Sequence, residues 1–222
     1  MLVSEVMTRI RNILGDATGS RWPDSRIIGL IDEAQKDISR KSLILKDSIN
    51  ILLHTSQSNY TLPSNVYRIT RATYLDKAMS ISSSGSMDLY DSTWIVTEGE
   101  PTTLVYDNIN KGIIRINPIP NFTEPEIFDI TTNPYVTIYY VKTPNTLTLA
   151  TDELEIPDDY VVLIEYYVSG RLFREDFDTQ NRTFGGEQLM LYSAGIKDVL
   201  KEVSKDFLGI STAYTVPYRK GV

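Results

Sequence analysis

The sequence predicts an α+β protein. We expect an antiparallel four-helix bundle, made from N- and C-terminal helical hairpins, with a central inserted antiparallel β domain and an extended C-terminal tail. Apolar residues recur every three or four positions near both ends of the chain, but alternate with polar residues in between. Each amphipathic helix must bury one apolar stripe, so the terminal helices should pack together. The expected boundaries are 1–46 and 157–209 for the bundle, 47–156 for the β domain and 210–222 for the extension.

A helical hairpin is predicted at the start of the chain. Residues 2–14 place their apolar side chains on one helical face, and Gly15 and Gly19 end this helix. Pro23 suits the first position of a second helix, whose apolar stripe continues to Ile38. Cations follow in the last turn, where they interact favourably with the helix dipole.

Short β-strands are predicted next, because the apolar period changes from about 3.6 to two. The expected strands lie at 49–53, 60–62, 66–75, 136–141 and 147–149, and the serine-rich segment 80–86 is interpreted as a loop tip.

Residues 94–120 are expected to form one compact β unit. The predicted order is a strand containing Trp94, a turn at Gly99 and Pro101, and two strands joined by a turn at 107–112. Proline cannot donate to a strand ladder, so the Pro-x-Pro sequence at 118–120 should end the unit.

Two further helices are predicted after the β region. Pro157 is expected to open the first, with acidic residues in its first turn and Arg171 and Arg174 in its last. Its interior is rich in β-branched residues, but its length and end signals favour a helix. The last helix shows clear helical spacing from 189 to 207, and Gly209 is its expected C-cap.

Composition excludes several classes of protein. The chain has no cysteine, which excludes disulfides and thiolate metal sites, and its single histidine is His54. There is no apolar run long enough for a transmembrane helix, and the charged N-terminus is not typical of a signal peptide. We expect a soluble protein that folds in the cytosol, with no cofactor and no metal.

Acidic residues are concentrated in the middle of the sequence. The chain has a net charge of −7, and residues 88–165 hold 14 acids and only three bases. Such a region repels nucleic acid, so it is not expected to bind DNA. A solvated acidic surface that aids solubility is the simpler interpretation.

Catalytic chemistry is not expected. His54 is interpreted as a sheet residue, so no nucleophile–base pair of the usual kinds can be built. Asp158 and Asp159 could in principle form a glycosidase pair, and Asp152 with Glu155 could bind a hard cation. Their positions in a helix start and in a turn explain them without function.

The C-terminal tail is the one segment that we single out as functional from the sequence. It combines aromatic anchors with cations and has no acid, and its candidate binding residues are Tyr214, Pro217, Tyr218, Arg219 and Lys220. Aromatic and arginine side chains often carry interface energy, whereas disordered tails are usually poor in aromatics. Docking onto a partner and a frayed terminus remain alternatives.

Taken in order, these features resemble the head-to-tail adaptor proteins, also called head-completion or connector proteins, of short-tailed bacteriophages. The resemblance lies in the opening helix, R-W-P-D-S-R-I-I-G-L-I-D-E-A-Q-K-D-I, Y-T-L-P, W-I-V-T-E-G-E-P with I-I-R-I-N-P-I-P, V-T-I-Y-Y-V, and L-E-I-P-D-D-Y-V-V-L-I-E-Y-Y-V. Family members usually have Ser or Thr at the position of Pro23, a change in cap chemistry only.

The resemblance implies a structural virion protein and not an enzyme. Many copies, typically twelve, would form a ring beneath the portal in the neck of the virion, after synthesis in the host cytoplasm. The helices and the tail would contact the portal protein, and the β part would face the next tail (nozzle) protein. Double-stranded DNA would pass through the centre without sequence-specific binding. Glu98, Glu100 and Asp107 are then candidates for acids that line the channel or face the tail.

Two other function classes stay open at this point. One is a carbohydrate- or receptor-binding β module on a helical stalk, which would need an exposed aromatic platform in the β region. The other is a carboxylate enzyme that depends on Asp158 or Asp159. Neither has a specific motif in its favour.

Overall fold

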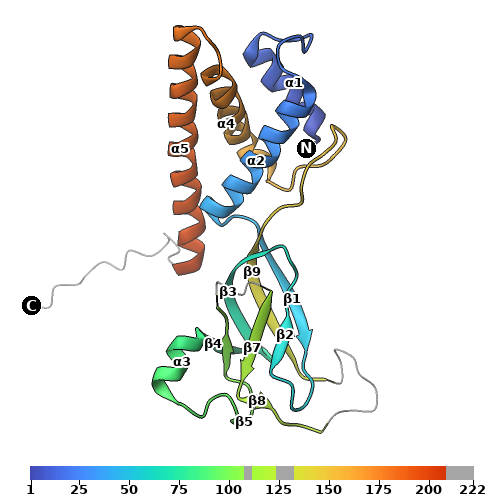
Figure 1. Ribbon diagram of the computed structural model, residues 1–222, viewed down its shortest axis with the longest axis vertical. Coiled ribbons are helices and arrows are strands. Elements are labelled where there is room, and N and C mark those ends of the chain that lie inside the picture. Colours follow the sequence, from blue (N-terminus) through green and yellow to red (C-terminus); the bar gives the residue numbers. More distant parts are fainter. Residues whose placement is uncertain (108–111, 124–132, 209–222) are drawn as a thin grey trace, which may run out of the picture. The chain divides into compact units, whose positions relative to one another are not determined.

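The computed structural model describes residues 1–107, 112–123 and 133–208 (Figure 1). The chain divides into two compact units. Unit 1 comprises Met1–Ile44 and Pro144–Val222, and unit 2 comprises Leu45–Thr143. Helices dominate unit 1 and strands dominate unit 2, so the α+β class is correct. Within the predicted turn at 107–112, residues 108–111 lie outside the described part of the chain, and so does Gly209.

Unit 1 contains four α-helices and one 3₁₀ helix within its described residues. They are α1 (Val3–Leu14), α2 (Asp24–Ser42), η1 (Asp158–Tyr160), α4 (Val161–Arg174) and α5 (Thr179–Leu208). The chain leaves α1 at Gly15, whose φ of 66° lies in the left-handed region that favours glycine. Pro23 precedes α2 at its N-cap. The β-branched segment after Pro157 forms η1 and α4, so the helical interpretation of that segment is confirmed.

The predicted four-helix bundle is wrong. In a four-helix bundle the helices run nearly antiparallel around one shared core, but here α1 has 12 residues, α5 has 30, and the two make few or no contacts with each other. At about 1.5 Å per residue, α5 is more than twice as long as α1. Instead, α1, α2 and α5 each pack on the short helix α4, and α2 crosses α4 at an angle (Figure 1). Periodicity showed which face each helix buries, but not which helix covers it.

The α4–α5 contact depends on a close approach of two glycines. A Cβ atom added at Gly185 would lie 2.9 Å from the backbone oxygen of Gly170 and 3.0 Å from the backbone nitrogen of Arg174. Backbone atoms cannot move aside as a flexible side chain can. The neighbouring Gly186 has no atom within 4 Å of its added Cβ. The two adjacent glycines therefore have different roles.

We expect Gly185→Ala to lower the free energy of unfolding by about 1–2 kcal/mol, because overpacking at this crossing outweighs the gain in helix propensity. Gly186→Ala is the matched control, and should raise stability by up to about 1 kcal/mol. Urea unfolding of both variants measures the difference. Equal stabilisation by the two substitutions would contradict the close approach.

Unit 2 is built on a seven-stranded, curled sheet. Its strand order is β1-β9-β3-β4-β6-β7-β2, and a separate small sheet pairs β5 with β8. The strands are β1 (Lys46–Leu52), β2 (Asn59–Thr61), β3 (Val66–Tyr74), β4 (Lys77–Ser82), β5 (Glu98–Gly99), β6 (Thr103–Val105), β7 (Ile113–Asn117), β8 (Ile119–Pro120) and β9 (Tyr135–Lys142). The sheet encloses its own hydrophobic core, which includes Leu53, Ile69, Leu104, Ile116 and Ile138.

The sheet is not entirely antiparallel, which corrects a second part of the predicted fold. β4 pairs with β6 in parallel, and β5 pairs with β8 in parallel. Parallel neighbours need a crossover connection of a dozen or more residues. The segment between β4 and β6 supplies it and contains a fifth helix, α3 (Ser84–Tyr90).

Three local predictions in or beside the β region also fail. The expected loop tip at 80–86 is the end of β4 and the start of α3, because Ser83 caps the helix by accepting from the Ser86 amide. Trp94 lies in a run of turns and not in a strand. Residues 147–149 form no strand; there the Leu147 amide donates to Asp32 of α2 at 3.0 Å.

Candidate interaction surfaces

The three acids singled out in the sequence each have a partner within unit 2. Glu98 accepts a hydrogen bond from the Asn121 side chain at 2.8 Å, and Glu100 forms an ion pair with Lys77 at 3.1 Å. Asp107 accepts from both the hydroxyl and the backbone amide of Ser84, which lowers its pKa. Glu98 and Glu100 are exposed around β5, whereas Asp107 is half-buried and anchors the start of α3.

Helix α3 is held in place although none of its residues is buried. Asp107 binds its first residue, and Asp88 accepts a hydrogen bond from the indole nitrogen of Trp94 at 2.8 Å. The guanidinium of Arg115 lies 5.0 Å from the centre of the Trp94 ring, an attractive cation–π distance. These polar contacts replace the apolar burial that usually fixes a helix.

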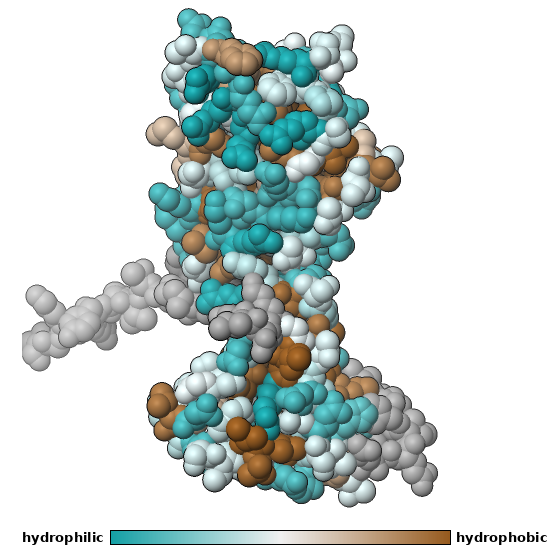
Figure 2. All heavy atoms as spheres, viewed as in Figure 1, coloured by the Kyte–Doolittle hydropathy of each residue, from teal (hydrophilic) through white to brown (hydrophobic). Residues whose placement is uncertain are grey.

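Large apolar side chains are exposed on α3 and in the turns that follow it. Leu89 and Tyr90 of α3 are 86% and 88% exposed, and Val96 is 73% exposed. Figure 2 shows hydrophobic residues on the surface of unit 2. Sequence reasoning missed this surface, because α3 has no apolar stripe to reveal it. Leu89 and Tyr90 are adjacent in α3, and adjoining exposed apolar residues are a candidate contact surface.

The aromatic platform required by the receptor-binding alternative is not found at Trp94. Trp94 is only 4% exposed, and Arg115 lies over its ring. The indole therefore packs inside unit 2 and does not present a flat face for a sugar.

All five candidate residues of the tail lie outside the described part of the chain. Tyr214, Pro217, Tyr218, Arg219 and Lys220 therefore keep their proposed role on sequence grounds alone.

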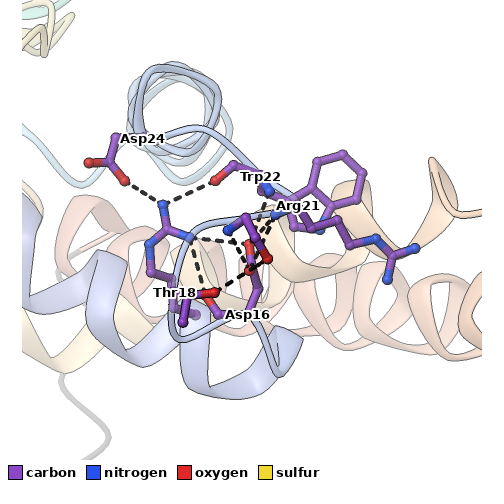
Figure 3. Close-up of polar contacts among 7 residues, drawn as sticks. Asp16, Thr18, Arg21, Trp22 and Asp24 are labelled. Atoms are coloured by element: carbon purple, nitrogen blue, oxygen red, sulfur yellow. Dashed lines mark hydrogen bonds and ion pairs between the residues drawn. The ribbon is translucent and has the colours of Figure 1, made fainter.

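A buried carboxylate organises the loop between α1 and α2. Asp16 is only 6% exposed, and it accepts backbone hydrogen bonds from Ser20 at 2.9 Å, Trp22 at 3.0 Å and Arg21 at 3.3 Å. Figure 3 shows the Arg21–Trp22 backbone directed at Asp16. These bonds, led by the one from Trp22, hold the pKa of Asp16 below its usual value.

Arg11 of α1 completes this loop structure. Its guanidinium pairs with Asp16 at 3.3 Å and with Asp24 at the start of α2, and it donates to the backbone oxygen of Trp22 at 3.1 Å. One arginine thus joins the end of α1, the loop and the beginning of α2. The sequence signal for this site is weak: an aspartate next to Gly15 at a helix end.

A second buried carboxylate connects this loop to the one between α4 and α5. Asp176 pairs with Arg21 and accepts hydrogen bonds from the Asn181 side chain and the Asp178 amide. The bond from Asn181, together with the pairing to Arg21, lowers the pKa of Asp176 to about 2. We call Arg11, Asp16, Arg21 and Asp176 the clasp.

The clasp predicts a stability change in acid. The folded-state pKa of Asp176 is about 2, below the value of roughly 3.9 for an unfolded chain. Its contribution should therefore be complete above about pH 4 and fall as pH approaches 2. Melting curves recorded from neutral pH downwards should show a larger fall in melting temperature for the wild type than for Asp176→Asn. Parallel losses in the two proteins would contradict this role.

The other polar candidates have structural roles. Asp152 accepts from the Thr148 and Leu149 amides, and Glu155 accepts from the Asn145 amide at 2.7 Å. Asp158 and Asp159 form η1 at the start of α4. Among the described residues there is no cluster of three or more possible metal ligands, and none of the described helices could cross a membrane.

Comparison with known proteins gives one family. No curated protein matches the chain. A family model described as SU10 adaptor protein matches residues 1–216, which is nearly the entire sequence. The chain therefore belongs to the SU10 adaptor protein family, a family of structural bacteriophage proteins.

Proposed function

We propose that this protein is the head-to-tail adaptor of a short-tailed phage, located in the neck of the virion. Copies of the chain, twelve in number, form a ring beneath the portal protein and connect it to the next tail (nozzle) protein. The observation that supports this most strongly is the family match over residues 1–216. No described residue arrangement favours an enzyme or a sugar-binding module over it.

The division into two units fits a connecting role. Each unit has its own core, so each can present a surface to a different partner. In the proposed arrangement, unit 1 and the extension 210–222 contact the portal. The exposed apolar end of unit 2, with Leu89, Tyr90 and Val96, faces the nozzle protein.

An acidic surface fits a conduit for DNA. Double-stranded DNA carries one negative charge per ~1.7 Å, so a channel must avoid binding it tightly. Glu98 and Glu100 are the exposed acids that we propose for the channel or for the tail-facing surface. The third candidate, Asp107, belongs to the same surface in this proposal, but it also holds α3 in place.

Reversal of the two exposed acids tests the conduit. Glu98→Lys with Glu100→Lys should slow DNA ejection from assembled virions, because the new cations attract phosphates. The matched control is Asp47→Lys, an exposed acid on β1 at the end of the sheet opposite to the β3–β4 turn, which should leave ejection unchanged. If the double variant ejects DNA at the wild-type rate, the proposal that Glu98 and Glu100 line the channel is wrong.

Binding to the portal tests the proposed function as a whole. Purified portal rings of the same phage are mixed with the chain and sedimented, and the mass of the pelleted complex is measured. We expect the chain to pellet with the portal, with one copy per portal subunit. A chain that stays in the supernatant at all concentrations would contradict the adaptor function.

A further inference from the structure

A groove on the outer side of α5 is the least explained surface of unit 1. It has a volume of about 530 Å³ and is lined by Arg174, Gly186, Leu189, Met190, Ser193, Ala194 and Lys197. We call it the α5 groove. Met190 is 73% exposed, although large apolar side chains are normally covered.

The α5 groove is basic as well as apolar. No acid lines it, and neither Arg174 nor Lys197 forms an ion pair with any described residue. An apolar groove edged by two available cations suits an occupant that is apolar and acidic. It suits DNA poorly, because the residues at its centre are small or apolar and the Ser193 hydroxyl already donates to the Leu189 oxygen at 2.8 Å. Only Arg174 and Lys197 could contact a phosphate there.

A surface with the opposite character lies elsewhere on unit 1. We call it the acidic strap, and it comprises Leu2, Leu149, Glu153, Asp158 and Asp159. Backbone contacts hold it together: Leu2 bridges Glu153, and the Ser4 amide donates to the Ala150 oxygen at 2.9 Å. Leu2 is 37% exposed and Leu149 is 60% exposed, and the three acids are exposed. Asp158 pairs with the N-terminal ammonium of Met1 at 3.2 Å, whereas Glu153 and Asp159 form no ion pair with a described residue.

The two surfaces occupy different sides of unit 1. The start of α4 lies next to the strap and makes two contacts with α5. Leu163 of α4 packs against Gly195 of α5, and the Tyr160 hydroxyl donates to Glu202 of α5 at 3.1 Å. Residues advance by about 100° around a helix, so Gly195 and Glu202 lie on the order of 140° from Met190 and Lys197. One molecule therefore cannot fill its own groove with its own strap.

We propose that the α5 groove receives the acidic strap of a second copy of this chain. Arg174 and Lys197 would then face Glu153 and Asp159, and Met190 would pack against Leu149 of the neighbour. The contact joins two different surfaces, so it is head-to-tail, and repetition closes a ring where the rotation allows it. This inference rests on the proposed ring function, and it names the surfaces that form the ring.

Charge exchange tests the pairing directly. One variant carries Arg174→Glu and Lys197→Glu, and the other carries Glu153→Lys and Asp159→Lys. Alone, each variant has like charges on both surfaces, so we expect its copy number on portal rings to fall at least fivefold. An equal mixture should restore the full copy number, because each variant then meets a complementary neighbour. Melting curves confirm that both variants fold.

Cysteine crosslinking provides a second measurement, because the natural chain has no cysteine. Met190→Cys combined with Leu149→Cys should give a ladder of covalent multimers on the portal with a short bismaleimide. Either single variant should give none. Both positions are exposed, so neither substitution should affect folding.

The outcomes separate this inference from the proposed function. Full rings formed by each charge variant alone, or crosslinked dimers from Met190→Cys alone, would overturn the groove–strap contact and leave the adaptor function standing. Failure of a mixture of folded variants to recover the copy number would overturn it too. If the wild type neither binds portals nor associates with itself, both fail.

Discussion

Removal of residues 209–222 is expected to weaken binding to the portal by roughly a hundredfold or more, without a change in the melting temperature of the protein. The removed segment holds two tyrosines, an arginine and a lysine with no acid, and truncation of single aromatic or arginine anchors often costs 2 kcal/mol or more. The described core of both units lies before residue 209, so the fold should remain. Sedimentation of portal rings with increasing amounts of each protein measures the affinity.

Point variants show whether the aromatic residues carry this binding. Tyr214→Ala with Tyr218→Ala should reproduce most of the loss in portal affinity. Thr212→Ala with Thr215→Ala is a control with the same number of substitutions in the same segment, and should leave the affinity unchanged. If the truncated chain binds portals as tightly as the full chain, the contact lies on the helices, and the proposed role of the tail is wrong.

Asp16→Ala is expected to cause a large loss of stability in unit 1, with a fall in melting temperature on the order of 10 °C. The substitution leaves three backbone N–H groups in the loop without their acceptor. It also removes one partner of Arg11, whose side chain is only 12% exposed. The lost bonds converge on a buried carboxylate and the guanidinium left behind is largely buried, so the loop between α1 and α2 should loosen.

Asp24→Ala is the matched control for this substitution. Asp24 pairs with the same arginine, but its side chain is 68% exposed, and exposed ion pairs contribute little. We expect its melting temperature to stay within about 2 °C of wild type. Calorimetry measures the melting temperatures of the two variants. If both fall by a similar amount, Asp16 acts only as a partner of Arg11, and its bonds to the loop backbone contribute little.

Local signals in the sequence predicted several elements well. The segment after Pro157 was identified as a helix in spite of its β-branched residues, because acids at its start and Arg171 and Arg174 at its end are typical helix signals. The long strands β1, β3 and β9 follow the alternation of apolar residues.

The arrangement of these elements could not be predicted in the same way. The crossing of α4 and α5 depends on the close contact between Gly170 and Gly185. A glycine in a sequence does not show which residue it will contact in the fold. Helix α3 has no buried residue, so no periodicity indicates it. Asp16 works through backbone amides four to six residues later, and a loop must fold before those bonds exist.

The most direct test of the adaptor function is electron microscopy of particles from a phage that lacks this protein. We expect heads that carry portals but have no tail, and tailed particles should return when the chain is supplied in the infected host. Normal tailed virions in the absence of the protein would contradict its proposed role in joining the head to the tail.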